Sequence, residues 1–233
     1  MASALAGVRV LDLSRVLAGP WASQILADLG ADVIKVERPG SGDETRSWGP
    51  PYHHDARGQP TAAYFLGTNR GKRSLTVDFT RPAGADIIRR LAGQSDVFLE
   101  NHKVGDLARY GLDYATLRTI NPTLVYCSIT GFGQTGPYAS RPGYDFAIQA
   151  LSGLMSVTGE PDGAPQKVGV AVTDLMAGLY ATIAILAALH HRDQRHEGQC
   201  IDVALLDVQV AALANVALNY LVSGSAKIGR AHV

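Results

Sequence analysis

The stretch that decides the fold runs Val8-Arg-Val-Leu-Asp-Leu-Ser14 and, after a helix-like segment, Ala31-Asp-Val-Ile-Lys-Val-Glu37. Both runs are rich in the branched apolar residues that favour strands. Between them, residues 20–29 have the composition of a helix with proline in its first turn, and Gly30 ends it. A strand–helix–strand unit of this length predicts two parallel strands joined by a right-handed crossover.

The same alternation continues along the chain. It predicts an α/β fold with a Rossmann-like, open, mostly parallel sheet and helices on both faces. Residues 38–60 are rich in Gly, Pro and Asp, and so long a loop in a compact domain is typical of a functional segment. Further strands are predicted at 73–79, 96–100, 123–130 and 200–206, helices at 82–92 and 207–221, and short helical pieces over 105–121.

Composition narrows the class of protein. The 233 residues carry 21 Lys and Arg against 21 Asp and Glu, so neither nucleic acid nor a membrane surface is indicated as a partner. Residues 1–7 lack the pattern of a secretory signal. The apolar run 175–189 is shorter than the ~20 residues that span a bilayer, so we expect a core helix of a cytoplasmic protein. Cys127 and Cys200 lie in apolar runs and are predicted to be buried free thiols.

Thr173 and Asp174 lie where a small apolar run ends and the long apolar helix should begin. The helix dipole would stabilise a negative charge at this place. An ionised carboxylate there, between Gly169 and Gly178, could serve as a nucleophile. A helix cap is the plainer role for the same residues, and this stretch alone leaves both open.

Other motifs are weaker. Gly131-Phe-Gly-Gln-Thr-Gly136 matches a dinucleotide fingerprint, but Pro137 follows where a helix should already have begun, so a turn is the better interpretation. The pairs His53-His54 and His190-His191 have no third ligand at a useful spacing, and we predict no metal site. Cations near three successive strands could surround a phosphorylated ligand at one edge of the sheet. They are Arg38, Arg70, Lys72, Arg73, Lys103 and Arg109.

Taken together, several ordered motifs resemble the family III CoA-transferases (CaiB/BaiF type), most of all those that act on succinate and glutarate. The resemblance covers nearly the whole chain. The motifs are LDLSRVLAGP (11–20), GADVIKVERPG (30–40), GDETR (42–46), NRGKRS (69–74), DVFLEN (96–101), GFGQTGPY (131–138), GYD (143–145) and GVAVTDL (169–175).

The resemblance implies a role for particular residues. Asp174 takes the position of the catalytic aspartate, and Tyr144 that of a substrate contact. CoA would bind as a substrate, with no permanently bound cofactor. The implied CoA contacts are Val16, Leu17, Ala18, Arg38, Val77, Asp78, Phe79, Thr80, Asn101, His102, Lys103 and Arg109. Among these, Arg38 would contact a phosphate, and residues 16–18 would line the adenosine site.

The family chemistry implied is transfer of CoA from an acyl-CoA to a carboxylic acid, through an aspartyl anhydride and an aspartyl-CoA thioester. Leu17, Thr80 and Pro142 differ from the Gln, Lys and Lys of oxalate-specific members, which argues against oxalate as the acid. Acyl-CoA and small dicarboxylic acids are therefore the expected partners, and the full-length enzyme is expected to be an interlocked homodimer.

Three rival functions remain. An α-methylacyl-CoA racemase shares the fold and the aspartate, but it uses a histidine where this chain has Tyr144, and a tyrosine with its pKa near 10 suits that proton transfer poorly. An inactive CoA-binding fragment is the second rival. A nucleotide-dependent oxidoreductase, the third, rests only on the glycine motif.

The domain prediction is a CoA-binding large domain over 1–205, followed by a helix and the start of a linker over 206–233. The abrupt end after an apolar helix suggests an N-terminal fragment whose small domain lies beyond it. Expressed alone, residues 1–233 are expected to be inactive and to associate, because the helix at 207–221 is apolar on more than one face.

Overall fold

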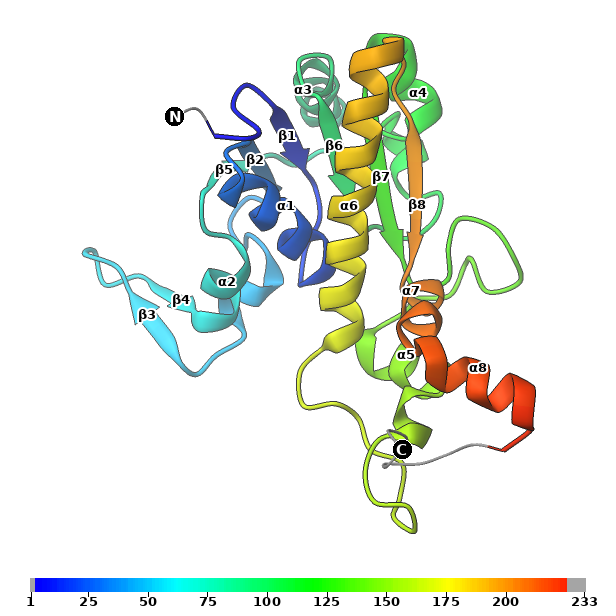
Figure 1. Cartoon of the computed structure of the whole chain (residues 1–233). Coiled ribbons are helices and arrows are strands. Elements are labelled where there is room, and N and C mark those ends of the chain that lie inside the picture. Colours follow the sequence, from blue (N-terminus) through cyan, green and yellow to red (C-terminus); the bar gives the residue numbers. More distant parts are fainter. Residues whose placement is uncertain (1–2, 226–233) are drawn as a thin grey trace.

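The computed structural model describes residues 3–225, and its centre is a six-stranded sheet in which all neighbouring strands are parallel (Figure 1). The strand order is β5-β2-β1-β6-β7-β8, so the chain builds outward from β1 and then returns to β6 to build the other half. This doubly wound order confirms the predicted Rossmann-like fold. The strands are β1 (Arg9–Asp12), β2 (Asp32–Glu37), β5 (Lys72–Thr76), β6 (Val97–Glu100), β7 (Val125–Thr130) and β8 (Cys200–Ala204).

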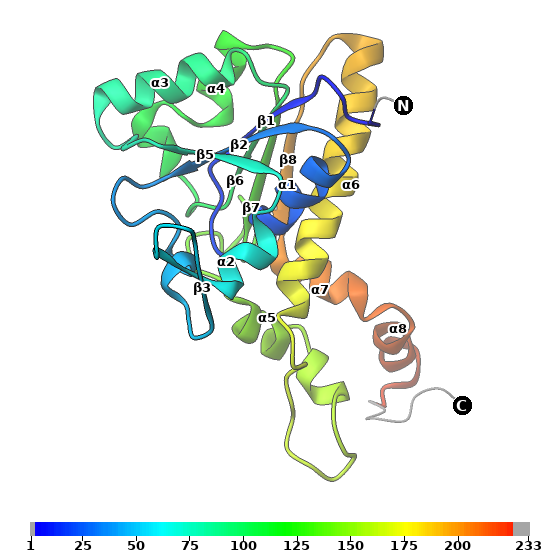
Figure 2. The ribbon, with the colours of Figure 1, turned by 90° about the vertical axis from the view of Figure 1, so that its left-hand side faces the viewer.

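Helices cover both faces of the sheet (Figure 2). The two faces arise because successive strand residues point to opposite sides. In β6, Val97 and Leu99 belong to the core cluster under α1 and α6, whereas Phe98 between them belongs to the cluster under α3 and α4. The helices are α1 (Ala18–Asp28), α6 (Val172–Arg195), α3 (Pro82–Ala92) and α4 (Tyr114–Ile120).

Helix α6 is longer than the apolar run suggested, with 24 residues. By length and composition it could cross a membrane, so the expectation that this segment is too short was wrong. In the fold it is a core helix, because its buried residues recur on one face and pack against α1. A Cβ atom on Gly178 would lie 2.7 Å from the carbonyl oxygen of Ala18, so glycine allows this close approach.

The predicted loop at 38–60 contains ordered elements. Asp43 caps a short 3-10 helix, η1 (Glu44–Ser47), by accepting a hydrogen bond from the Thr45 N–H at 3.0 Å. A hairpin then projects from the body of the molecule and leads into a short helix (Figure 1). The further short elements are β3 (Tyr52–His54), β4 (Pro60–Ala62), α2 (Ala63–Thr68), η2 (Leu107–Tyr110), α5 (Asp145–Leu151) and η3 (Leu154–Val157).

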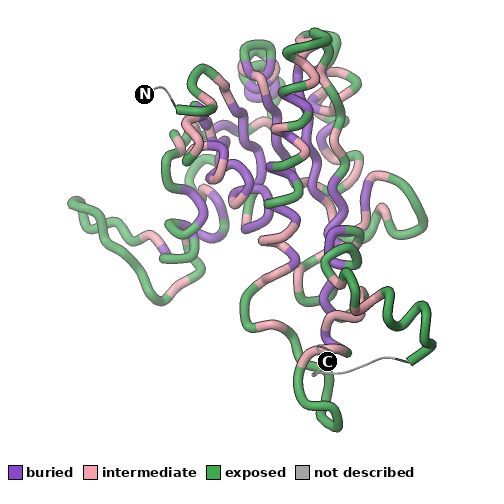
Figure 3. The backbone as a smooth tube through the Cα atoms, viewed as in Figure 1, coloured by how far each residue is buried: buried purple, intermediate pink, exposed green. Residues whose placement is uncertain are grey.

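The predicted single helix at 207–221 is two helices, α7 (Leu205–Ala212) and α8 (Ala214–Ser223), bent by 75°. The bend occurs at Ala214, whose φ of 45° is outside the right-handed helical region. Helix α7 packs against the core, whereas no residue of α8 is buried (Figure 3). Cys127 is buried as predicted, but Cys200 is exposed because β8 is an edge strand of the described sheet.

Candidate functional site

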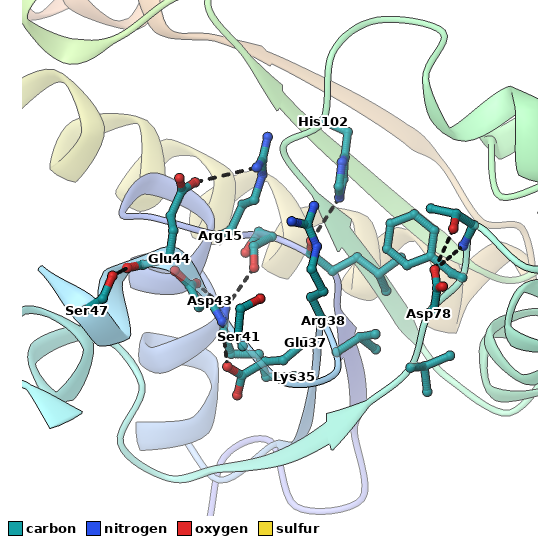
Figure 4. Close-up of a pocket in the computed structure, with 17 residues that line it drawn as sticks. Arg15, Lys35, Glu37, Arg38, Ser41, Asp43, Glu44, Ser47, Asp78 and His102 are labelled. Atoms are coloured by element: carbon teal, nitrogen blue, oxygen red, sulfur yellow. Dashed lines mark hydrogen bonds and ion pairs between the residues drawn. The ribbon is translucent and has the colours of Figure 1, made fainter. Parts of the chain in front are cut away.

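The candidate site lies at the carboxyl end of the sheet, beside the topological switch point between β1 and β6. On one side of this point successive strands are added in one direction, and on the other side in the opposite direction. In open α/β sheets this is the place where ligands bind. A cavity there has a volume of about 450 Å³, and its wall is formed by the segments that follow β1, β2 and β5 (Figure 4). Of the residues implied as CoA contacts, those that line this cavity are Arg38, Val77, Asp78, Phe79, Thr80 and His102.

A second, smaller cavity of about 130 Å³ adjoins the first. Arg15, Glu44 and His102 line both cavities, so the two are adjacent. The remaining implied residues, apart from Arg109, line the smaller cavity. They are Val16, Leu17, Ala18, Asn101, Lys103, Tyr144 and Asp174. Residues 16–18 therefore line the same cavity as the candidate nucleophile, and their place in the adenosine site stays a prediction.

Arg109 lines neither cavity. It lies on η2, where its guanidinium contacts the Asp106 carboxylate at 2.8 Å. The prediction that Arg70, Lys72 and Arg73 lie at the same edge of the sheet as Arg38, around one phosphorylated ligand, was wrong. These residues precede or begin β5, whereas Arg38 follows β2, and in a parallel pair the two positions lie at opposite edges of the sheet. Each of the three is already paired with an aspartate: Asp28, Asp12 and Asp32 respectively.

Buried ion pairs build the wall of the larger cavity. The Lys35 Nζ atom lies 3.0 Å from Asp43 Oδ2, with both side chains almost fully buried. Glu37 accepts two hydrogen bonds from the Arg46 guanidinium, both at 2.7 Å. Burial alone would raise the pKa of Glu37, but the bonds from Arg46, the Asp43 N–H and Ser74 outweigh it and lower the pKa to about 2. These pairs fix the loop after β2 against the end of that strand.

The loop between β1 and α1 is strained beside the smaller cavity. Val16 has a φ of 69°, which is unusual for a β-branched residue. Asn101 holds the loop by accepting from the Arg15 N–H at 2.9 Å and donating to the Arg15 carbonyl at 2.7 Å. Asp43 accepts from the Val16 N–H at 3.3 Å. The Asn101 side chain is therefore engaged with the loop, which the sequence did not indicate.

Asp174 is the third residue of α6 and does not cap it. The helix begins at Val172, and the residue before it, Ala171, offers no side-chain hydrogen bond. Asp145, at the start of α5, supplies the missing acceptor: its Oδ2 accepts from the N–H groups of Thr173 at 2.8 Å and of Asp174 at 3.3 Å. Sequence reasoning missed this role, because nothing in either segment signals that α5 begins beside the first turn of α6.

The electrostatic setting of Asp174 differs from the expected ionised carboxylate. Burial, followed by the negative charge of Asp145, raises the pKa of Asp174 to about 7. Burial, together with the Arg15 charge, lowers the pKa of His102 to about 4, so this imidazole is neutral at pH 7. Burial and the charges of Asp174, Asp145 and Asp43 raise the pKa of Tyr64 to about 12. The proton affinity of the Asp174 carboxylate itself is therefore raised, which is typical of functional carboxylates.

The glycine motif is a turn. Gly131-Phe-Gly-Gln-Thr-Gly136 follows β7, and the next helix starts only at Asp145, which confirms the predicted turn. A Cβ atom on Gly131 would lie 2.5 Å from the Gly143 Cα atom, so the two backbones touch and bring Tyr144 to the cavity wall. Within residues 3–225, no group of three or more His, Cys, Asp or Glu side chains is arranged to hold a metal ion.

Comparison with known proteins gives consistent matches. The model for CoA-transferase family III matches residues 5–233. A succinate–glutarate CoA-transferase of Agrobacterium fabrum is 58% identical over 231 residues, which are 98% of this chain and 58% of that protein. A succinyl-CoA:glutarate CoA-transferase of Mus musculus is 52% identical over 218 residues, 94% of this chain and 49% of that protein.

Among solved structures, that of a CAIB/BAIF family protein from Brucella suis has a TM-score of 0.96 and 55% identity, over 100% of this chain and 61% of that one. The chain thus spans only about half to three fifths of the length of these relatives.

Proposed function

The chain belongs to CoA-transferase family III, and we propose that the protein moves CoA from an acyl-CoA thioester to a small dicarboxylic acid, with Asp174 as the nucleophile. The observation that carries this proposal is that Asp174 lies in the wall of a cavity that adjoins the larger one lined by Arg38 and residues 77–80. Relatives named as succinate–glutarate CoA-transferases support the dicarboxylate class of acid.

The proposed reaction exchanges one acyl bond for another in four steps. The Asp174 carboxylate attacks the thioester carbonyl of the donor, which forms a mixed anhydride and releases the CoA thiolate. The thiolate attacks the Asp174 carbonyl, which gives an aspartyl-CoA thioester and releases the donor acid. The acceptor carboxylate attacks this thioester, and the thiolate released then attacks the acceptor carbonyl, leaving acyl-CoA and free Asp174. Every step conserves one activated acyl bond, which is the gain from covalent catalysis.

Residues around Asp174 can serve these steps. Arg38 is exposed at the larger cavity and would contact a CoA phosphate. The start of α1 contributes its N-cap residue Leu17 and its first residue Ala18 to the wall beside Asp174. The N–H groups of a first helical turn have no partner inside the helix. These amides are our candidates for stabilising the tetrahedral oxyanion.

The racemase alternative is not favoured. A racemase needs a second proton-transfer group next to Asp174, and Tyr144 is 71% exposed with its neighbour Asp145 engaged by the backbone of α6. Because the chain covers only part of its relatives' length, the homodimer that the family resemblance implies and the cytoplasmic location expected from the sequence are also proposals.

Activity of the full-length protein tests the proposal. Succinyl-CoA is incubated with a panel of carboxylic acids, and new acyl-CoA products are identified by mass spectrometry. Asp174→Ala should abolish transfer but leave CoA binding, measured by calorimetry, largely intact. With acyl-CoA and hydroxylamine, the wild type should acquire a hydroxamate at Asp174. Substantial transfer by Asp174→Ala, or an adduct mapped to another residue, would contradict the assignment.

A further inference from the structure

Asp145, the first residue of α5, is engaged on both carboxylate oxygens by groups at the start of α6 and within α5. Its Oδ2 accepts the two N–H bonds from Thr173 and Asp174. Its Oδ1 accepts a hydrogen bond from Gln149 Nε2 at 2.6 Å. A carboxylate brought to a helix start from another element satisfies N–H groups that have no partner in the helix, and its charge complements the helix dipole.

Gln149 determines how this carboxylate is oriented. The side chain is fully buried, and its Oε1 accepts from the Val168 N–H at 2.9 Å. With the amide oxygen occupied, Gln149 can present only its NH₂ group to Asp145. On the other side of the turn, Thr173 Oγ1 donates to Gln209 Oε1 of α7 at 2.7 Å. The turn that carries Asp174 is therefore held by side chains from two other helices.

We infer that Asp145 is a positioning residue for the Asp174 nucleophile, fixing the backbone of the turn that carries it, while Gln149 orients the Asp145 carboxylate. The inference rests on the proposed function, since it concerns the same site. Asp145 takes no part in bond making. Its contribution is to hold Asp174 in one place while the thioester carbonyl and then the CoA thiolate approach.

Asp145 also acts on Asp174 through its charge. After burial, this negative charge is the cause that raises the pKa of Asp174. An Asp174 carboxylate of higher basicity is a stronger nucleophile once ionised, at the cost of a smaller ionised fraction near pH 7. The other charged or titratable groups that line the cavity of Asp174 are Arg15, Glu44, His102, Lys103 and Tyr144, and Tyr64 of α2 is close enough to feel the Asp174 charge.

A double-mutant cycle in the full-length enzyme tests the positioning role. Asp145→Asn keeps an oxygen for the α6 N–H groups but can turn an NH₂ group toward Gln149 Nε2, so kcat should fall roughly tenfold to hundredfold, with KM for acyl-CoA changed less than about twofold. Adding Gln149→Glu supplies an acceptor for that NH₂ and still accepts from Val168. The double variant should regain about tenfold in kcat. Asp207→Asn, at an exposed acid in the first turn of α7, is the matched control and should leave kcat unchanged.

The pH dependence of kcat distinguishes a specific effect of Asp145 on Asp174 from a general loss of folded enzyme. Without the charge at Asp145, the acid limb of kcat should move to lower pH in Asp145→Asn, whereas the double variant keeps a carboxylate at the neighbouring position 149. A carboxyl titration of Asp174 by ¹³C NMR should show the same shift and needs no turnover. A wild type that transfers no CoA would overturn the proposed function, while the titration would still test the contact.

Unchanged kcat and an unchanged acid limb in Asp145→Asn would overturn the positioning role. So would a double variant no faster than the single one. If Asp145→Asn fails to fold, the double variant, which restores the hydrogen bonds, carries the test: it should fold and transfer CoA, and the opposite result overturns the inference.

Discussion

Replacing Asp174 with asparagine should stabilise the folded protein above pH 7, even though it should remove activity. The folded state raises the pKa of Asp174 from 3.8 to about 7, through burial first and the Asp145 charge second. The folded state therefore binds this proton more tightly than the unfolded chain does. The wild type loses stability as the pH rises from about 4 to about 7, and loses no more above that. An asparagine carries no such penalty.

The size of the effect follows from the shift. About three pKa units would be worth ~4 kcal/mol as an upper limit, at ~1.4 kcal/mol per unit. Asp174 is partly exposed at the cavity wall, so water screens its charge, and we expect about 2 kcal/mol. For a chain of 233 residues this corresponds to a rise in Tm of about 4–8 °C at pH 8, shrinking toward zero near pH 4.

The assay is thermal and urea unfolding of wild type and Asp174→Asn, followed by circular dichroism at pH 4.5, 6 and 8. Asp162→Asn, at an exposed position in the loop before α6, is the control and should leave Tm unchanged at each pH. The reasoning is refuted if the difference between Asp174→Asn and wild type is the same at every pH, or if the variant is less stable at pH 8.

Three further predictions follow from the cavities and from α8. Arg38→Ala should weaken CoA binding roughly tenfold to hundredfold and pantetheine binding little, because only CoA carries the phosphates; equal losses in calorimetry would exclude a phosphate contact. Glu37→Gln should cost about 1.5–3 kcal/mol by breaking the pair with Arg46. Because the pKa of Glu37 is lowered, its contribution is present above about pH 4.5 and fades as the pH falls toward 2, so urea midpoints of variant and wild type should converge in acid. Residues 1–233 expressed alone should bind a hydrophobic dye, since Leu221 and Val222 are 73% and 87% exposed; replacing both with serine should reduce the binding, and a dye-silent monomer would contradict the prediction.

The sheet could be predicted because its signals are local. Each buried strand is a short apolar run, and the helix at 82–92 has a proline start and a glycine end, so its predicted bounds agree with α3. The break between α7 and α8 could not be predicted in the same way. No proline or glycine marks it, and it arises because α7 packs on the core whereas α8 has no buried residue.

The site was predictable only where a motif names a residue. Asp174 and residues 77–80, which the resemblance names, line the cavities, and their roles stay predictions. The role of Asp145 and the hydrogen bonds of Asn101 to the Arg15 backbone were missed, because both side chains bind backbone groups far along the chain. The cations before β5 were misjudged for a geometric reason: a residue that precedes a parallel strand lies at the opposite edge from one that follows its neighbour.

The charges of the site divide its carboxylates into two kinds. Asp12 and Glu37 are buried with cations, Lys72 and Arg46, and attraction to them lowers each pKa despite burial. Within residues 3–225, Asp174 forms no ion pair, and its pKa is raised. A paired carboxylate has its oxygens held by donors and its negative charge neutralised, so it can serve as a fixed structural part of the cavity wall. A nucleophile needs an oxygen free to bond carbon, and leaving a carboxylate unpaired next to a second one makes it more basic. The same kind of side chain therefore builds the wall of one cavity and supplies the reactive group of the other, according to whether a cation is placed beside it.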